Sequence, residues 1–215
     1  RRARGVGGGR GGTEVARNAA ASVKRVHQEL GGKSPNVLLA DADFERAVKQ
    51  SVLHVFQNSG QSCNAPTRML VPAQKLAAVE AIAKRVAESV VVGDPSSDKT
   101  SVGPVVSKLQ FDRVEGFIEK GIAEGANLIT GGAGRPAGLS KGYYVKPTIF
   151  SNVRNDMTIA REEIFVPVLF IRPSPTAEEA VQLANHTPSG LPASRCSRDH
   201  YARALGGHRL PAAQS

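Results

Sequence analysis

Several residue types are scarce in this 215-residue sequence, and each scarcity narrows the possible architectures. Tryptophan is absent and aromatic residues make up only 5% of the chain. The two cysteines, Cys63 and Cys196, are too few for a small disulfide-stabilised fold, so we expect thiols in a reducing compartment, the cytoplasm. No apolar run approaches the roughly 20 residues of a membrane-spanning helix. With 40% hydrophobic residues, the chain is long enough to bury an ordinary core.

The formal charge of +9 raises the question of nucleic-acid binding. Most of the excess lies in the two ends. Residues 1–12 contain four arginines and no acid, and residues 195–215 contain four arginines and one aspartate. A phosphate-binding surface needs its basic residues on a folded face, whereas these ends are rich in glycine or alanine. We therefore expect neither a nucleic-acid partner nor a membrane partner.

Apolar periodicity predicts an α/β fold with a mostly parallel sheet and flanking helices. The Gly/Arg-rich residues 1–12 lack periodicity, so they are expected to be irregular, and the GVGGGRGG stretch is not read as a cofactor-binding turn because no strand is expected before it. Asp41 or Asp43 is a candidate N-cap. The expected helices are 15–26, 44 to the break at Asn58, 76–90, 107–124 and 177–184, and the expected strands are 37–39, 68–71, 127–130, 143–149 and 166–171.

Cys63 is the candidate nucleophile because it follows a helix and has glycine, glutamine, serine and asparagine as neighbours. A nucleophilic thiol needs small neighbours that admit a carbonyl group, and backbone N–H groups directed at the oxyanion. Gly60 provides room, and the N–H of Cys63 itself is a natural donor. The alternative is that Cys63 is a small buried hydrophobic residue. Cys196 has no partner motif and is not expected to act.

Glu29 is the candidate base, since its apolar flanks suggest partial burial, which would raise the pKa of the carboxyl group. It could then accept a proton from water or from the thiol. The alternative is a glutamate at a helix end or turn that faces solvent. His27 is a second candidate base, but no acidic residue beside it would orient its ring, so we favour a structural role.

Three motifs follow one another along the chain: ELGGKSP at residues 29–35, NSGQSC at residues 58–63 and EEIFVPV at residues 162–168. This ordered set resembles the motifs of the NAD(P)-dependent aldehyde dehydrogenases. The blocks GDP, VGPVVS, EGA and GYYVKPTIF between them are also similar to family segments. The interval of 34 residues from Glu29 to Cys63 resembles the family interval between general base and nucleophile. The resemblance extends from about Ala19 to Arg203.

This resemblance implies a reaction and a set of site residues. Cys63 would attack the aldehyde carbonyl to form a thiohemiacetal, hydride would pass to the nicotinamide of NAD or NADP, and Glu29 would deprotonate the water that hydrolyses the thioester. Glu163 and Phe165 match positions that hold the nicotinamide ribose. Gln110 matches a ribose-side contact and Leu30 a backbone contact to the nicotinamide. No metal ligands are implied.

The chain also departs from the family pattern. Val166 stands where family members usually have glycine, which adds a branched side chain beside the expected cofactor-binding turn. Compared with the family, the chain is expected to lack most of the Rossmann-type cofactor domain and the oxyanion-hole asparagine. The resemblance therefore implies that residues 1–28 are a remnant of the cofactor-binding domain with an irregular start, that residues 29–205 are the catalytic thiol domain, and that residues 206–215 are an irregular tail.

Two alternatives remain open beside an aldehyde-oxidising enzyme. The chain could be a redox-inactive fragment that serves as a structural or interaction module, or a weak thiol esterase in which Cys63 and Glu29 act without NAD. The resemblance implies a small-molecule aldehyde as substrate and a homo-oligomer for the full-length parent.

Overall fold

The computed structural model describes residues 2–187 and 193–198. Two compact units follow one another along the chain, and the boundary falls between Gly32 and Lys33. The expected tail at residues 206–215 lies outside the described residues. No helix in the described part of the chain is long and apolar enough to cross a membrane.

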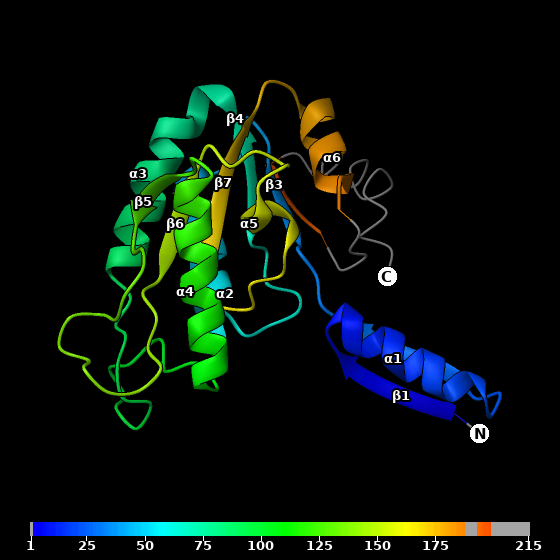
Figure 1. The fold of residues 1–215 in the computed structure, drawn as a ribbon. Helices are drawn as coiled ribbons and strands as arrows, with labels where there is room; N and C mark the ends of the chain where they lie inside the picture. Colours follow the sequence, from blue (N-terminus) through cyan, green and yellow to red (C-terminus); the bar gives the residue numbers. More distant parts are fainter. Residues whose placement is uncertain (1, 188–192, 199–215) are drawn as a thin grey trace. The chain divides into compact units, whose positions relative to one another are not determined.

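The first unit is a strand–helix–strand motif, labelled in blue in Figure 1. Strand β1 (Arg2–Gly7) pairs in parallel with β2 (Arg25–Leu30), and helix α1 (Gly9–Ala20) connects them. The expectation of an irregular start was therefore wrong, and a strand does precede the glycine-rich turn. Backbone pairing with β2 supplies hydrogen bonds that do not depend on side chains, so it outweighs the weak strand propensity of the sequence.

The second unit contains a six-stranded sheet in the order β5-β6-β7-β4-β3-β8. Only the β5–β6 pair is antiparallel among these neighbours, so the predicted mostly parallel sheet is confirmed. The strands are β3 (Pro35–Leu38), β4 (Arg68–Pro72), β5 (Asn127–Thr130), β6 (Thr148–Ser151), β7 (Val168–Ser174) and β8 (Ser194–Cys196).

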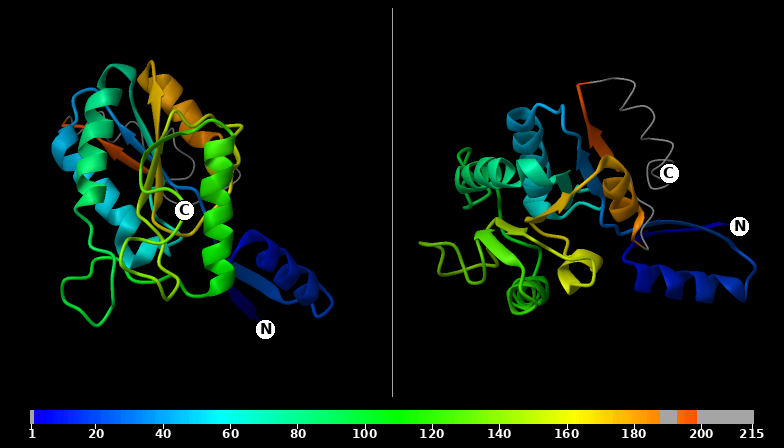
Figure 2. Two further views of the ribbon diagram at one scale, coloured as in Figure 1. Left: turned by 60° about the vertical axis from the view of Figure 1, so that its left-hand side comes forward. Right: turned by 90° about the horizontal axis from the view of Figure 1, so that it is seen from above.

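Helices cover both faces of this sheet (Figures 1 and 2). Two of them begin at side-chain caps: Asp43, one of the two candidate caps in the sequence, accepts a hydrogen bond from the N–H of Arg46, and Ser107 accepts one from the N–H of Gln110. The α-helices are α2 (Phe44–Phe56), α3 (Leu76–Glu88), α4 (Lys108–Ala123), α5 (Thr158–Arg161) and α6 (Ala177–Asn185), and the 3₁₀ segments are η1 (Gln57–Gly60) and η2 (Ala73–Lys75).

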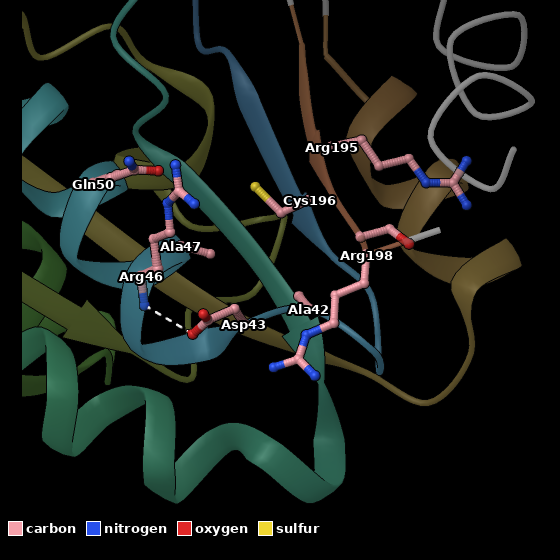
Figure 3. Close-up of a pocket in the computed structure, with 9 residues that line it drawn as sticks. Ala42, Asp43, Arg46, Ala47, Gln50, Arg195, Cys196 and Arg198 are labelled. Carbon is pink, nitrogen blue, oxygen red and sulfur yellow. Dashed lines mark hydrogen bonds between the residues drawn. The ribbon is translucent and has the colours of Figure 1, made fainter. Parts of the chain in front are cut away.

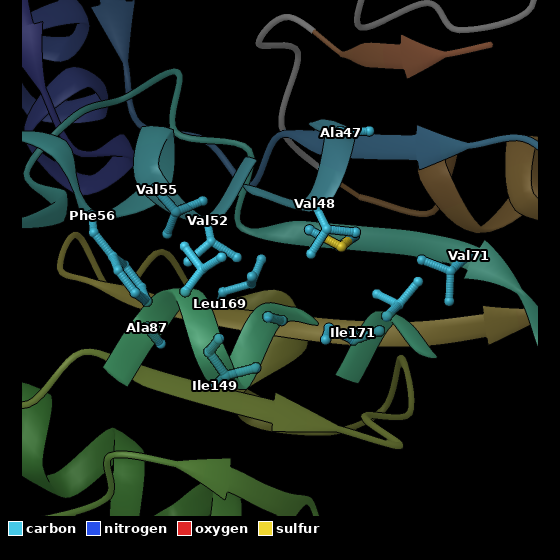
Figure 4. Close-up of a cluster of buried hydrophobic side chains, with 14 of the residues drawn as sticks. Ala47, Val48, Val52, Val55, Phe56, Val71, Ala87, Ile149, Leu169 and Ile171 are labelled. Atoms are coloured by element: carbon cyan, nitrogen blue, oxygen red, sulfur yellow. The ribbon is translucent and has the colours of Figure 1, made fainter. Parts of the chain in front are cut away.

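Alternate residues of the central strands enter different parts of the core. In β7, Leu169 and Ile171 pack with α2 and α3 in the cluster drawn in Figure 4, whereas Val168 and Phe170 pack with α4 and α5. On the α4–α5 side of the sheet, α6 packs separately against Val37 of β3 and Leu70 of β4. The period of two that characterises strands thus produces a three-layer α/β unit.

Two predicted strands begin later than expected, and a proline explains each difference. Residues 143–149 and 166–171 were predicted as strands, but β6 begins at Thr148, directly after Pro147, and β7 begins at Val168, directly after Pro167. Proline has no N–H to donate to a neighbouring strand, so the pairing starts after it. The three-residue strand β8 was not predicted.

Arg68 links three parts of the second unit from the first position of β4. Its side chain is only 2% exposed. Its Nε donates to the carbonyl of Lys33 at 2.6 Å, and its two terminal nitrogens donate to the carbonyls of Leu183 at 3.0 Å and Ala184 at 2.7 Å. The last carbonyls of a helix lack partners within the helix and carry partial negative charge, so a guanidinium group caps α6.

We predict that Arg68→Met lowers the free energy of unfolding by about 3 to 5 kcal/mol, because it removes the buried guanidinium donor from three carbonyl groups. Urea denaturation of the chain measures the change. Arg85→Met is the matched control, because Arg85 is exposed and pairs with exposed Glu45 on the surface. Arg85→Met should lower the free energy of unfolding by less than about 1 kcal/mol. Equal losses of free energy of unfolding in the two variants would show that the buried hydrogen bonds of Arg68 do not stabilise the fold.

Candidate active site

Cys63 lies in the loop between α2 and β4, and its side chain is half-buried. The loop begins with three successive left-handed residues: Asn58 with φ 52°, Ser59 with φ 54° and Gly60 with φ 70°. Left-handed backbone costs about 1 to 2 kcal/mol for each non-glycine residue. A strained turn of this kind persists only where the surrounding structure holds it, and such turns cluster at functional sites.

Side-chain hydrogen bonds hold this turn to the segment before α4. The hydroxyl group of Ser59 donates to the carbonyl of Gly103 at 3.0 Å. The side-chain oxygen of Gln61 accepts from the N–H of Val106 at 3.1 Å. Asn58 closes the turn itself, because its side-chain amide donates to the carbonyl of Gln61 at 2.9 Å. The NSGQSC and VGPVVS blocks of the sequence therefore meet in the structure.

Gly60 brings the third block, EEIFVPV, against the same turn. A Cβ atom at position 60 would overlap the backbone of Val166 and Pro167, so no other residue fits without displacing that segment. Phe165 is itself left-handed, with φ 64°, and its side chain is 38% exposed. The next side chain, Val166, is 1% exposed and packs in the core with Phe111 and Val168. The branched side chain that departs from the family pattern thus faces the interior.

Two side chains of α4 hold the backbone that carries the candidate ribose-binding residues. Gln110 donates from its side-chain amide to the carbonyl of Ile164 at 3.0 Å, and Arg113 donates to the carbonyl of Glu163 at 3.0 Å. The amide of Gln110 is therefore used within the protein, and its expected contact to a ribose stays a prediction. The structure brings the segments of Cys63, Gln110, Glu163 and Phe165 together in the second unit.

Lys33, at the start of this unit, is a buried cation beside the site. It is 2% exposed, and its ammonium group lies 5.4 Å from the centroid of the Phe170 ring. Burial, and less strongly the positive charge of Arg68, lowers the pKa of Lys33 to about 7, although the carboxylates of Glu163 and Glu162 oppose both effects. Burial also lowers the pKa of Arg68, to about 10. Two buried cations thus lie close together, with Glu163 among their counter-charges.

Glu29 and Leu30 belong to the first unit. Both lie in β2, where Gln28 donates to the carbonyl of Gly12 at 2.6 Å and Leu30 packs over Gly12 of α1. Strand alternation therefore turns His27 and Glu29 to the opposite face, and both are exposed. The expected partial burial of Glu29 was wrong, as was its alternative placement in a turn or at a helix end. Its role as base toward Cys63, and the backbone role of Leu30, stay predictions.

Cys196 lies elsewhere in the second unit, in strand β8. It lines a cavity of about 490 Å³ with Asp43, Arg46, Arg195 and Arg198, as Figure 3 shows. Its thiol group contacts the side-chain oxygen of Asn36 at 3.7 Å. A second, mostly apolar cavity of about 460 Å³ lies beside Leu53 and Val90. Neither of these two cavities includes Cys63.

The sequence interpretation missed three residues that shape the site: Lys33, Arg68 and Arg113. Lys33 stands within the ELGGKSP motif, so its position was visible in the sequence. Arg68 directly precedes the apolar run of β4. A charged residue at that position indicates either an edge strand or a buried side chain that binds neighbouring segments. Arg113 carries no such signal, because an arginine on the exposed side of an amphipathic helix is ordinary.

The fold and the site together define an α/β protein whose candidate centre is a loop-borne thiol clamped by two other chain segments. The model of the aldehyde dehydrogenase family matches residues 4–206, and the chain belongs to this family.

Relatives and solved structures agree with this assignment. The chain is 54% identical over 186 residues to a 3-succinoylsemialdehyde-pyridine dehydrogenase of a Pseudomonas species, covering 86% of this chain and 39% of the relative. Aldehyde dehydrogenase C of Pseudomonas syringae, a cysteine-to-alanine mutant solved with NAD+ and octanal, is 49% identical with a TM-score of 0.95, covering 96% of this chain and 43% of that one. The Mycobacterium tuberculosis aldehyde dehydrogenase solved with NAD+ is 40% identical, with a TM-score of 0.94. The match covers 96% of this chain and 43% of that chain. The chain thus spans about two fifths of the length of these proteins.

We predict that Gly60→Ala destabilises the second unit by more than about 2 kcal/mol, because it combines a left-handed backbone with overlap against the backbone of Val166 and Pro167. Gly116→Ala is the control, and it should change the free energy of unfolding in the opposite direction. Gly116 lies in the interior of α4 with nothing near its Cβ position, so alanine should stabilise the helix by about 0.5 to 1 kcal/mol. Urea denaturation measures the free energy of unfolding of both variants. An unchanged free energy of unfolding in Gly60→Ala would show that the turn is not tightly clamped.

Lys33 also predicts a pH dependence of stability. Its pKa is about 7 in the folded chain and 10.5 ordinarily, so between these values the unfolded chain binds more protons and stability rises with pH. The slope contributed by one such group is at most about 1.4 kcal/mol per pH unit. Urea midpoints measured from pH 6.5 to 9 should rise in the wild type more steeply than in Lys33→Met. Parallel profiles would contradict the titration of a buried Lys33.

Proposed function

We propose that the chain carries the thiol chemistry of an enzyme that oxidises an aldehyde to a carboxylic acid with NAD(P)+, and that Cys63 is the nucleophile. The observation that carries this proposal is the clamped, left-handed turn before Cys63, on which the segments around Gly103 and Val166 converge. Family membership supports it. Because the chain spans about two fifths of its relatives, the activity is proposed for the protein that contains this segment.

The reaction divides into acylation and deacylation. After the thiol of Cys63 has lost its proton to solvent, the thiolate sulfur attacks the aldehyde carbon, and the carbonyl oxygen becomes an oxyanion that the N–H of Cys63 is suited to stabilise. Re-formation of the carbon–oxygen double bond expels the hydride with its electron pair and leaves a thioester on Cys63. Glu29 then takes a proton from water, and the resulting hydroxide attacks the thioester. Cleavage of the carbon–sulfur bond releases the carboxylic acid and the thiolate, and the proton held by Glu29 returns to the sulfur to regenerate the thiol.

The residues of the EEIFVPV block fit the nicotinamide half of NAD(P)+, which supplies the hydride acceptor when bound. Glu163 offers a carboxylate that can accept hydrogen bonds from ribose hydroxyls. Phe165 offers a ring that is 38% exposed on a left-handed turn, which is unusual for a large apolar side chain. Gln110 supports this turn through Ile164, and Leu30 is the further backbone contact. Two relatives solved with NAD+ are chemical precedents for such a site.

A small-molecule aldehyde is the proposed substrate, and the octanal held by the Pseudomonas syringae neighbour supports this class. The proposed protein acts in the cytoplasm as a homo-oligomer. Nucleic acid is not a proposed partner, because the basic excess lies in the two ends of the chain rather than in its central part.

Acyl transfer to Cys63 tests the proposal directly. We predict that p-nitrophenyl acetate gives a burst of nitrophenolate from the wild-type chain and an acetyl group on Cys63 by peptide mass spectrometry. Cys63→Ala should abolish the burst, whereas Glu29→Gln should keep it and slow the later turnover, because only deacylation needs the base. An acetyl group that resides on Cys196 would overturn the assignment.

Cys196→Ala is the matched control and should behave as the wild type. Iodoacetamide should also modify Cys63 faster than Cys196, whose thiol would lose its contact to Asn36 on ionisation. Absorbance at 340 nm with NAD+ or NADP+ and a series of aldehydes then measures oxidation. An acyl burst without reduction of either cofactor would favour a thiol esterase over the proposed dehydrogenase.

A further inference from the structure

Glu124 begins the EGA block at residues 124–126, which has no part in the proposed reaction. It is the C-cap of α4, and its side chain is half-buried. Its carboxylate accepts two hydrogen bonds from one residue of another helix, because the N–H and the hydroxyl group of Thr158 each donate to a different carboxylate oxygen at 2.7 Å. Such a bidentate, charge-assisted contact fixes direction as well as distance. The end of α4 is thus linked to the start of α5.

Helix α5 depends on acceptors from outside itself. It has only four residues, and a helix of this length is not stable alone. Its N-cap is Met157, whose thioether sulfur is a weak acceptor, so the N–H groups of the first turn need other partners. A negative charge is favourable at the amino end of a helix and unfavourable at the carboxyl end. The carboxylate of Glu124 therefore opposes α4, which it ends, and stabilises α5.

The rest of the EGA block fixes the place from which Glu124 reaches α5. Gly125 ends α4 in the left-handed conformation, with φ 88°, and its N–H donates to the carbonyl of Ile122 at 3.0 Å. The N–H of Ala126 donates to the carbonyl of Gly121 at 3.0 Å. A Cβ atom on Gly121 would lie 2.9 Å from the side chain of Ile159, so α4 and α5 approach each other closely. The end of α4 is a rigid support packed against α5.

The start of α5 is connected to Glu163 by one helical turn. The carbonyl of Thr158 accepts from the N–H of Glu162 at 2.9 Å, so the residue before Glu163 belongs to the same hydrogen-bonded unit. Two side chains near the other end of α4 donate to the carbonyls of Glu163 and Ile164, both at 3.0 Å. Residues 158–164 are therefore held by α4 at both ends, which restricts the directions in which their side chains can point.

We propose that Glu124 is a positioning residue: through its two hydrogen bonds to Thr158 it fixes the start of α5, and thereby the orientation in which Glu163 and Phe165 hold the nicotinamide ribose. This inference rests on the proposed function, which assigns these two side chains to the ribose. Glu124 itself touches neither cofactor nor substrate.

Hydrogen exchange tests the link without any cofactor. In the 215-residue chain, Glu124→Met removes both acceptors at similar side-chain length, and it should accelerate amide exchange in a peptide of residues 158–164 at least about tenfold. A peptide from α3 should exchange as in the wild type, because α3 packs in the other core cluster. Glu119→Met, which removes an exposed acid of α4, is the matched control and should change neither. Unchanged exchange at 158–164 in Glu124→Met, or equal acceleration in both peptides, would overturn the inference.

Glu124→Gln separates the hydrogen bonds from the charge. The amide oxygen of glutamine accepts from the N–H of Thr158, and the amide nitrogen donates to the hydroxyl oxygen, so both contacts persist. Exchange at residues 158–164 should accordingly stay within about threefold of the wild type. Acceleration as large as that of Glu124→Met would overturn positioning through these hydrogen bonds.

Thr158 provides a reciprocal pair of variants should Glu124→Met fold poorly. Thr158→Val removes the hydroxyl donor and keeps the N–H, so it should accelerate exchange at residues 158–164, by a smaller factor than Glu124→Met. Thr158→Ser keeps both donors and should exchange as the wild type does. Equal exchange in Thr158→Val and Thr158→Ser would overturn the inference.

Calorimetric titration with NAD+ separates this inference from the proposed function. Glu124→Met should bind about five- to tenfold more weakly than the wild type, and Glu124→Gln within about twofold of it. This loss of affinity should exceed any loss of the burst with p-nitrophenyl acetate, which needs no cofactor. Unimpaired binding by Glu124→Met, or equal losses of binding and burst, would overturn the role of Glu124 alone. No binding by the wild type would overturn the cofactor site of the proposed function, and the positioning role with it.

Discussion

The guanidinium group of Arg68 donates hydrogen bonds to three backbone carbonyls from two separate parts of the chain, and the second unit is organised around it. Two of them belong to the carboxyl end of α6, and the third belongs to Lys33. A single planar group therefore fixes a helix on one face of the sheet and also the start of β3. Because Arg68 opens β4, only four residues separate it from Cys63. The candidate nucleophile is thus attached to one of the most constrained points of the chain.

A second constraint acts on the other side of Cys63. The turn at Asn58 and Ser59 stores backbone strain, and Gly60 admits the backbone of Val166 and Pro167 where a side chain would exclude it. The segment that Gly60 admits carries Phe165, which is also left-handed. Two strained turns therefore support one another through a contact between main chains. Such a contact tolerates changes of side chain at Val166, whose side chain is buried in the core, but not at Gly60.

The sequence predicted those parts of the fold in which periodicity and local chemistry agree. Phe111, Val114 and Ile118 recur at helical spacing and are buried, whereas Ile122, one turn further on, is 45% exposed because it lies in the last turn of α4, next to the end at Ala123. Strand β1 could not be predicted, since its pairing partner β2 lies more than 20 residues away and its own residues have weak propensity. The motifs located Cys63, but not the hydrogen bonds of Ser59 and Gln61 that fix its loop. Those depend on which segments meet after folding.

Two adjacent buried cations need an explanation that one does not. Arg68 is satisfied by carbonyl groups and would be stable with an apolar residue beside it, so Lys33 adds repulsion to the cost of its own desolvation. The negative charges of Glu163 and Glu162 oppose this cost without cancelling it, because the pKa of Lys33 is still lowered to about 7. Titratable groups with strongly shifted pKa values are concentrated at functional sites. Lys33 therefore lies where the contacts of Arg68 and the charge of Glu163 both act on one buried side chain.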